Sequence, residues 1–189
     1  MRTLQAVAQG SVQPPRFIVL EHEGEDPLAD PVVLIGKGIT FDTGGISLKQ
    51  GTGMWDMKFD MGGSAAVIGA MQAVARLNLP TRTVGLVAAA ENMPGSKALK
   101  PGDIVRSMLG KTIEIRSTDA EGRLVLADAL CYAARFSPAA AIDLATLTGA
   151  CVTALGNDAS GLMSNNNDLA DAISQAGDRT GEIAWRLPI

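Results

Sequence analysis

The stretch PVVLIGKGITFDTGGISLK (residues 31–49) joins an apolar run to a segment rich in glycine and charge. Its first six residues are almost continuously aliphatic, which predicts a buried β-strand. The glycines that follow predict a loop after this strand, and that loop carries Lys37, Asp42 and Lys49. A buried strand that runs into a polar loop is typical of open α/β sheets, whose sites form at the carboxyl ends of the strands.

Strand and helix patterns alternate along the rest of the chain. The sequence predicts further strands over residues 16–22, 81–90, 111–117, 140–147 and 161–165, and helices over 61–77, 121–136 and 167–176. Glycine, proline and lysine make residues 91–103 a predicted loop. This alternation predicts an α/β fold with helices on the faces of the sheet.

Composition narrows the possible functions. The chain has 189 residues, of which 47% are hydrophobic and 19% charged, as expected for a globular protein with a large core. No apolar run reaches the roughly 18 residues that a membrane helix needs. A net charge of −4 argues against nucleic acid as the main partner. Because His22 is the only histidine, a histidine-based metal site or a Ser-His-Asp triad is not expected within the chain.

Four acidic residues fall at predicted strand-to-helix junctions. Asp42 follows a strand, Asp60 precedes a helix, and Asp119 and Glu121 lie between a strand and a helix. Taken singly, Asp60 could be a helix N-cap, and Asp119 and Glu121 could complement a helix dipole. Together at one edge of a sheet, the four carboxylates would repel one another, which costs free energy. Bound divalent cations would remove that cost. Two ions about 3.5–4 Å apart can activate one water for hydrolysis.

The glycine-rich stretch GKGITFDTGG (residues 36–45) also suggests a phosphate-binding loop. It lacks the GxxxxGK[ST] spacing of such loops, and its acid would repel a phosphate group. The sequence therefore favours a metal site over a phosphate site at this edge of the sheet.

Five blocks of sequence, in their order and spacing, resemble the leucyl aminopeptidase family. They are GKGITFDTGGISLK (36–49), KFDMGGSAAV (58–67), ENMPGSKALKPGD (91–103), STDAEGRLVLADALCYAARF (117–136) and DLATLTGACVTALG (143–156). Ser117 departs from the family, which usually has Asn there, and it lies beside the predicted ligands without being one of them. The resemblance implies a three-layer α/β/α zinc-exopeptidase-like domain with a mixed, largely parallel central sheet, and the sheet is expected to be incomplete.

The resemblance also implies two divalent metal ions, Zn²⁺ or Mn²⁺, with Mg²⁺ or Co²⁺ possible at an exchangeable position. The tightly held ion would be bound by Lys37, Asp42, Asp60 and Glu121. The exchangeable ion would be bound by Asp42, Asp119 and Glu121, so that Asp42 and Glu121 bridge the pair. As a ligand Lys37 would have to be neutral, which two neighbouring dications favour.

The same resemblance assigns roles in catalysis and substrate binding. Lys49 would stay charged and polarise the scissile carbonyl, and Arg123 would hold a bicarbonate ion that acts as general base for a water bridging the metals. Met57, Thr146 and Gly149 would line the pocket for the first side chain of a peptide with a free N-terminus. Ordinary packing explains Met57 and Thr146 equally well.

By this resemblance, residues 1–189 would be part of a C-terminal catalytic domain, without the N-terminal domain and the end of the catalytic domain. The leading hypothesis is a cytoplasmic, metal-dependent aminopeptidase that forms homo-oligomers, hexamers in the family, and has no membrane partner. One alternative is a truncated, non-catalytic scaffold or DNA-associated subunit. Another is a remnant that binds metal without turnover.

Overall fold

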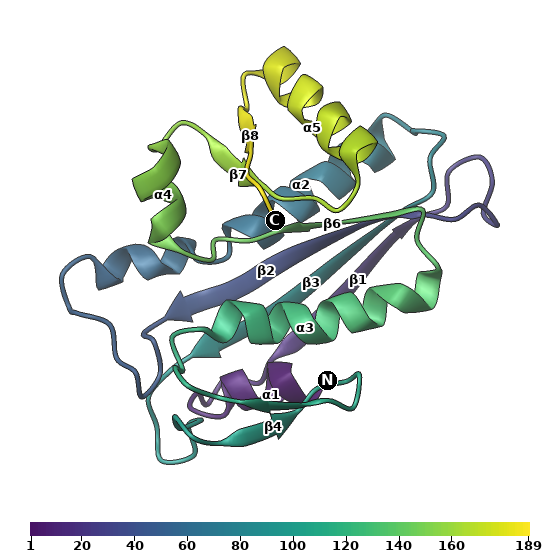
Figure 1. Cartoon of the computed structure of the whole chain (residues 1–189). Coiled ribbons are helices and arrows are strands. Elements are labelled where there is room, and N and C mark those ends of the chain that lie inside the picture. Colours follow the sequence, from purple (N-terminus) through teal and green to yellow (C-terminus); the bar gives the residue numbers. More distant parts are fainter. The chain divides into compact units, whose positions relative to one another are not determined.

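The computed structural model describes all 189 residues as two compact units, Met1–Leu147 and Thr148–Ile189 (Figure 1). The larger unit contains the main sheet and the segments that carry all four predicted metal-binding acids. None of the helices combines the length and the apolar character that crossing a lipid bilayer requires.

A four-stranded sheet in the order β1-β3-β2-β6 forms the centre of the larger unit. Its strands are β1 (Arg16–His22), β2 (Val32–Asp42), β3 (Thr83–Asn92) and β6 (Ala140–Leu144). The strands β2, β3 and β6 run parallel to one another, and β1 is antiparallel to β3. The predicted α/β class with a mixed, largely parallel sheet is confirmed.

Helices cover both faces of this sheet and complete three layers (Figure 1). On one face, α1 (Arg2–Ala8) and α3 (Glu121–Ala133) pack against strands β2 and β3 around a core that includes Ile35, Leu86 and Val125. On the other face lies α2 (Gly62–Arg76), where Val67 contributes to a smaller apolar cluster. Two short 3-10 helices, η1 (Met54–Phe59) and η2 (Ala134–Phe136), precede α2 and follow α3.

Strand β2 is longer than predicted and corrects the expected position of two site residues. It extends to Asp42, so that Lys37 and Asp42 lie within the strand and not in a loop after it. The glycines that suggested a loop serve close packing instead, because a Cβ atom at Gly36 would lie only 2.6 Å from Ser64 Cα in α2. Strand β3 has the predicted length but lies two residues further along the chain than predicted, and it ends at Asn92.

The strand predicted over residues 111–117 does not belong to the main sheet. Only three of these residues form a strand, β5 (Thr112–Glu114), and it pairs with β4 (Ile104–Arg106) in a separate antiparallel ribbon. The loop after β5 still reaches the main sheet, because the Thr118 hydroxyl donates a hydrogen bond of 2.6 Å to the Gly44 carbonyl just beyond β2. This contact brings the start of α3 to the carboxyl ends of the parallel strands.

The smaller unit contains α4 (Gly149–Leu155), β7 (Ser160–Leu162), α5 (Asn167–Thr180) and β8 (Ala184–Arg186). Strands β7 and β8 pair in parallel. Helix α4 was not predicted, although Thr148 is a regular N-cap whose hydroxyl accepts a hydrogen bond from the Ala150 amide at 3.2 Å. Helix α5 begins at its predicted position and ends four residues later than predicted.

The close approach of α2 to β6 predicts a strong effect at one glycine. A Cβ atom at Gly63 would lie 1.9 Å from the Leu144 carbonyl oxygen. We expect Gly63→Ala to lower the free energy of unfolding by about 1–3 kcal/mol, since backbone must move to admit the methyl group. Urea unfolding followed by circular dichroism measures this change.

Gly69 in the same helix provides the matched control, because no atom lies within 4 Å of a Cβ atom built there. Gly69→Ala should raise the free energy of unfolding by about 0.5–1 kcal/mol, since alanine is the better helix former. Equal effects of the two substitutions would contradict the packing described for α2.

Candidate metal centre

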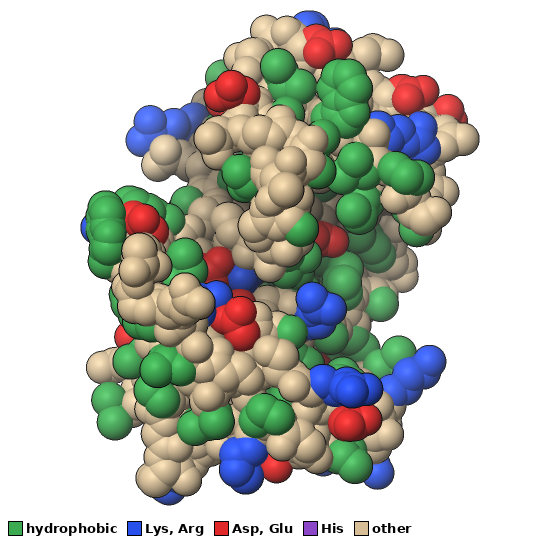
Figure 2. Space-filling view, turned by 60° about the vertical axis from the view of Figure 1, so that its left-hand side comes forward, with side chains coloured by type: hydrophobic (Ala, Val, Ile, Leu, Met, Phe, Trp, Pro, Cys, Tyr) green, Lys and Arg blue, Asp and Glu red, His purple; other side chains and the backbone are tan.

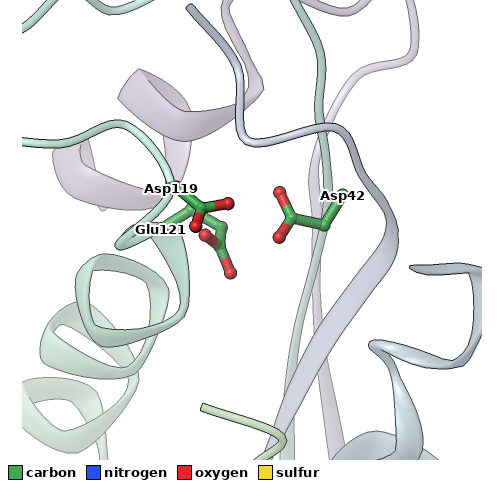
Figure 3. Close-up of side chains that lie close together, drawn as sticks. All are labelled: Asp42, Asp119 and Glu121. Carbon is green, nitrogen blue, oxygen red and sulfur yellow. The ribbon is translucent and has the colours of Figure 1, made fainter. Parts of the chain in front are cut away.

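Three carboxylates converge at the carboxyl ends of β2 and β3. Asp42 ends β2, Asp119 lies in the loop before α3, and Glu121 is the first residue of α3. One carboxylate oxygen from each lies within 4.8 Å of the other two. Figure 3 shows Asp42 facing Asp119 and Glu121 across a small gap. These are the three residues that the family resemblance assigned to the exchangeable metal ion.

Two lysines lie among the acids and divide them into two groups. The Lys37 ammonium lies 2.8 Å from Asp60 Oδ1 and 2.9 Å from Glu121 Oε1. The Lys49 ammonium lies 2.8 Å from Asp42 Oδ2 and 2.5 Å from Asp119 Oδ1. Acidic and basic side chains lie in contact on the face shown in Figure 2. The centre therefore contains all four predicted acids and both predicted lysines.

Two carboxylate oxygens in this centre are buried without a hydrogen-bond partner. They are Asp60 Oδ2 and Glu121 Oε2. An unsatisfied buried oxygen of this kind costs about 1–3 kcal/mol, and more when charged. Oxygen donors of carboxylates suit divalent cations, and a neutral lysine adds a nitrogen donor. The residues present therefore fit a divalent metal ion, which would satisfy both oxygens.

Burial and ion pairing oppose each other in these groups, and the pKa values of Asp60, Glu121 and Lys49 are all raised. Burial raises the pKa of Asp60 and of Glu121 above the ordinary carboxyl range, even though Lys37 opposes the shift. Burial lowers the pKa of Lys49, but hydrogen bonds to Asp119 and Asp42 outweigh burial and raise its pKa well above the ordinary value. Lys49 is therefore a protonated, positively charged group at neutral pH.

The raised pKa of Glu121 predicts a pH-dependent difference in stability between wild type and Glu121→Gln, without metal. The glutamate stabilises the folded chain below its ordinary pKa of 4.5, and this contribution is lost as pH rises through the raised value. Glutamine does not titrate. We expect the stability of Glu121→Gln relative to wild type to increase as the pH rises above 4.5, as measured by urea unfolding with a chelator present. A difference that is constant with pH would contradict this assignment.

Asp60 is not the helix N-cap that one interpretation of the sequence suggested. Helix α2 begins at Gly62 after Met61, and no side chain caps it. Asp60 Oδ1 instead accepts a hydrogen bond of 2.7 Å from the Thr146 hydroxyl, in addition to its ion pair with Lys37. The acid therefore points toward the candidate metal centre.

The remaining predicted site residues lie in different surroundings. Met57 lines an open pocket of about 350 Å³ together with Lys49. Thr146 contacts the centre directly, since its carbonyl accepts a hydrogen bond of 2.6 Å from Lys37 and its hydroxyl binds Asp60. Arg123 is exposed in the first turn of α3. Gly149 belongs to the smaller unit, at the start of α4.

Sequence analysis missed the polar residues that hold these segments together. Ser47 and Thr118 form a reciprocal pair: the Ser47 amide donates to Thr118 Oγ1 at 2.8 Å, and the Thr118 amide donates to Ser47 Oγ at 3.1 Å. Asn92 donates to both Asp42 and Thr118. Ser117 Oγ accepts from the Asp119 amide at 3.3 Å and takes no other part in the centre. No spacing pattern marks such residues, although Thr118 lies directly beside a predicted ligand.

Together, the fold and this centre define an α/β domain with a carboxylate-rich candidate metal site at the carboxyl ends of its parallel strands. The chain belongs to the cytosol aminopeptidase family, because the sequence model of the catalytic domain of that family matches residues 1–189. The family expected from the five sequence blocks is therefore confirmed.

Individual relatives agree with this assignment. The chain is 59% identical to a probable cytosol aminopeptidase of Azotobacter vinelandii and 58% identical to one of Azoarcus sp., in each case over 100% of this chain and 38% of the relative. It is also similar to the solved structure of the bottromycin maturation enzyme BotP, with a TM-score of 0.90 and 48% identity over 98% of this chain and 39% of that one. The chain thus spans well under half the length of the relatives it matches.

Proposed function

We propose that this chain carries the metal-binding and catalytic residues of a metal-dependent aminopeptidase that removes the N-terminal residue, leucine among others, from peptides. The convergence of Asp42, Asp119 and Glu121 within 4.8 Å is the observation that carries the proposal. Membership of a family of aminopeptidases and the unsatisfied oxygens of Asp60 and Glu121 support it. A cytoplasmic location and a homo-oligomeric assembly, hexameric by the family resemblance, belong to the same proposal.

Two divalent metal ions, Zn²⁺ or Mn²⁺ with Mg²⁺ or Co²⁺ as alternatives at one position, would be held by the clustered side chains. When bound, the two ions supply Lewis-acid activation of water and of the substrate carbonyl. One set of ligands would be Lys37, Asp42, Asp60 and Glu121, and the other Asp42, Asp119 and Glu121. Lys37 is buried on the middle of β2, and its Nζ atom lies 2.8 Å from Asp60 Oδ1 and 2.9 Å from Glu121 Oε1, within reach of an ion that these acids would hold.

Lys49 has the position and charge to stabilise negative charge that develops on the substrate. Its ammonium lies at the border between the carboxylates and the open pocket lined by Met57. From there it would donate a hydrogen bond to the scissile carbonyl oxygen, and the donation strengthens as that oxygen becomes an anion. The two neighbouring acids hold Lys49 protonated for this role.

Arg123 and the pocket complete the proposed site. Arg123 presents a positive charge two residues after Glu121 in the first turn of α3, and it would hold a bicarbonate ion beside the centre. The apolar part of the pocket, with Met57 and Met54, suits an apolar first side chain of the substrate. Thr146 would orient Asp60 through the hydrogen bond from its hydroxyl. The family resemblance also gives Gly149 a role in substrate binding.

Hydrolysis of leucine amide, compared with N-acetyl-leucine amide, tests the proposal. The metal-loaded chain should release ammonia from leucine amide and leave the acetylated compound intact, since an aminopeptidase requires a free α-amine. Glu114→Gln, a change at an exposed acid on the β4–β5 ribbon, is the matched control and should keep full activity. Two bound metals without turnover would favour a non-catalytic metal-binding role, and cleavage of both substrates would contradict an exopeptidase.

A further inference from the structure

Asn92, the last residue of β3, is buried at the back of the candidate metal centre with 4% of its surface exposed. Its side-chain amide nitrogen donates to Asp42 Oδ1 at 2.7 Å and to the Thr118 carbonyl at 3.0 Å. Both partners can only accept hydrogen bonds here, so the orientation of the Asn92 amide is fixed. Neither sequence pattern nor family resemblance gave Asn92 a role.

The bond from Asn92 gives the two oxygens of Asp42 different surroundings. Oδ1 accepts from Asn92 and also from the Gly44 amide at 2.9 Å. Oδ2 faces the centre, where it lies 2.8 Å from the Lys49 ammonium. Two donors on one oxygen hold the carboxylate plane, so that the other oxygen points toward the proposed metal ions.

Asn92 also ties together the two segments that carry the acids. Its backbone carbonyl accepts from the Thr43 amide at 2.9 Å and from the Thr43 hydroxyl at 2.8 Å, immediately after Asp42. Its side chain binds the carbonyl of Thr118, immediately before Asp119. The segment that follows β2 also packs tightly on Asn92, since a Cβ atom at Gly45 would lie 2.9 Å from Asn92 Oδ1. One buried amide therefore sets how far the end of β2 lies from the start of α3.

We propose that Asn92 is a positioning residue of the metal centre, which orients Asp42 and fixes its distance from Asp119 and Glu121. The inference rests on the proposed function, because it assumes that these carboxylates bind metal. Residues that orient metal ligands by hydrogen bonds typically contribute about 10–100-fold to metal affinity. Asn92 would act through Asp42 and would not itself touch metal or substrate.

Calorimetric titration of the whole chain with Mn²⁺ tests this inference, in wild type and in Asn92→Leu and Asn92→Ala. Both variants remove the amide donor, and the smaller alanine keeps the test valid if the leucine variant does not fold. We expect Mn²⁺ affinity to fall about 10–100-fold in both. The visible absorption spectrum of the Co²⁺-loaded chain should also change, because it reports ligand geometry and not overall stability.

Asp128→Asn is the matched control for a general loss of stability. Asp128 is fully buried in α3 and accepts hydrogen bonds from the Thr3 amide at 2.9 Å and the Met108 amide at 2.8 Å, and it contacts none of the proposed ligands. This variant should lower the melting temperature while Mn²⁺ affinity and the Co²⁺ spectrum stay as in wild type.

The possible outcomes separate the two proposals. Wild-type binding of Mn²⁺ with equal affinity in the Asn92 variants would overturn the positioning role and leave the proposed function intact. An equal loss of affinity in Asp128→Asn would also overturn it, since general loosening would then explain the effect. No Mn²⁺ binding by wild type would overturn the proposed function and this inference with it.

Discussion

Replacing Glu121 with glutamine is expected to reduce binding of divalent metal from two ions per chain to one weakly held ion or none. Glu121 belongs to both proposed ligand sets, and its Oε2 is buried without a partner. Glutamine keeps the size of the side chain but removes its charge, which leaves Lys37 with Asp60 as its only acidic partner. We expect the loss of affinity to exceed the roughly 100-fold that removal of a supporting residue can cost.

Metal analysis after gel filtration and calorimetric titration measure this effect in the folded variant. Because burial raises the pKa of Glu121, the metal-free glutamine variant should be at least as stable as wild type at neutral pH, so that unfolding does not explain the loss. Glu114→Gln serves as the control and should bind metal as wild type does. Retention of two metals in Glu121→Gln would show that the carboxylate is not a bridging ligand.

Replacing Lys49 with methionine is expected to lower kcat for leucine amide by about 10²–10³-fold while two metals remain bound. Methionine keeps the length of the side chain and removes the charge that would stabilise the developing oxyanion. The carboxylates of Asp42 and Asp119, which now pair with Lys49, would remain available to metal. The expected separation of turnover from metal content distinguishes Lys49 from the proposed ligands.

Steady-state kinetics on matched, metal-loaded samples provide the measurement. Lys97→Met, a change at an exposed lysine, should leave kcat and metal content unchanged. An unchanged kcat in Lys49→Met would remove Lys49 from the proposed mechanism. Loss of both metals in the same variant would instead make Lys49 part of the binding site.

The class of fold and the acids of the centre could be predicted from sequence because each has a local signal. Aliphatic runs predicted β2 and β3, and helical spacing predicted α2 and α3. Positions at the ends of these elements placed Asp42, Asp60, Asp119 and Glu121 at one edge of the sheet. The structure brings the segments carrying these acids together.

Other features depend on tertiary contacts and could not be predicted locally. The glycines around Lys37 look like a loop, and only the packing of Ser64 against Gly36 shows that they belong to a strand. The predicted strand over 111–117 has the alternation of a sheet strand, yet β5 pairs with β4 alone. Asn92 has no pattern around it, because its role comes from meeting Asp42, 50 residues earlier in the chain.

The number of divalent ions bound by the wild-type chain tests the central claim most directly. Purified chain would be saturated with Zn²⁺ or Mn²⁺, freed of excess metal and analysed beside Asp119→Ala and Glu121→Ala. The account predicts close to two ions per chain in wild type, with fewer in both variants. Wild-type chain without bound metal, or variants that bind as much metal as wild type, would contradict a metal centre built from these carboxylates.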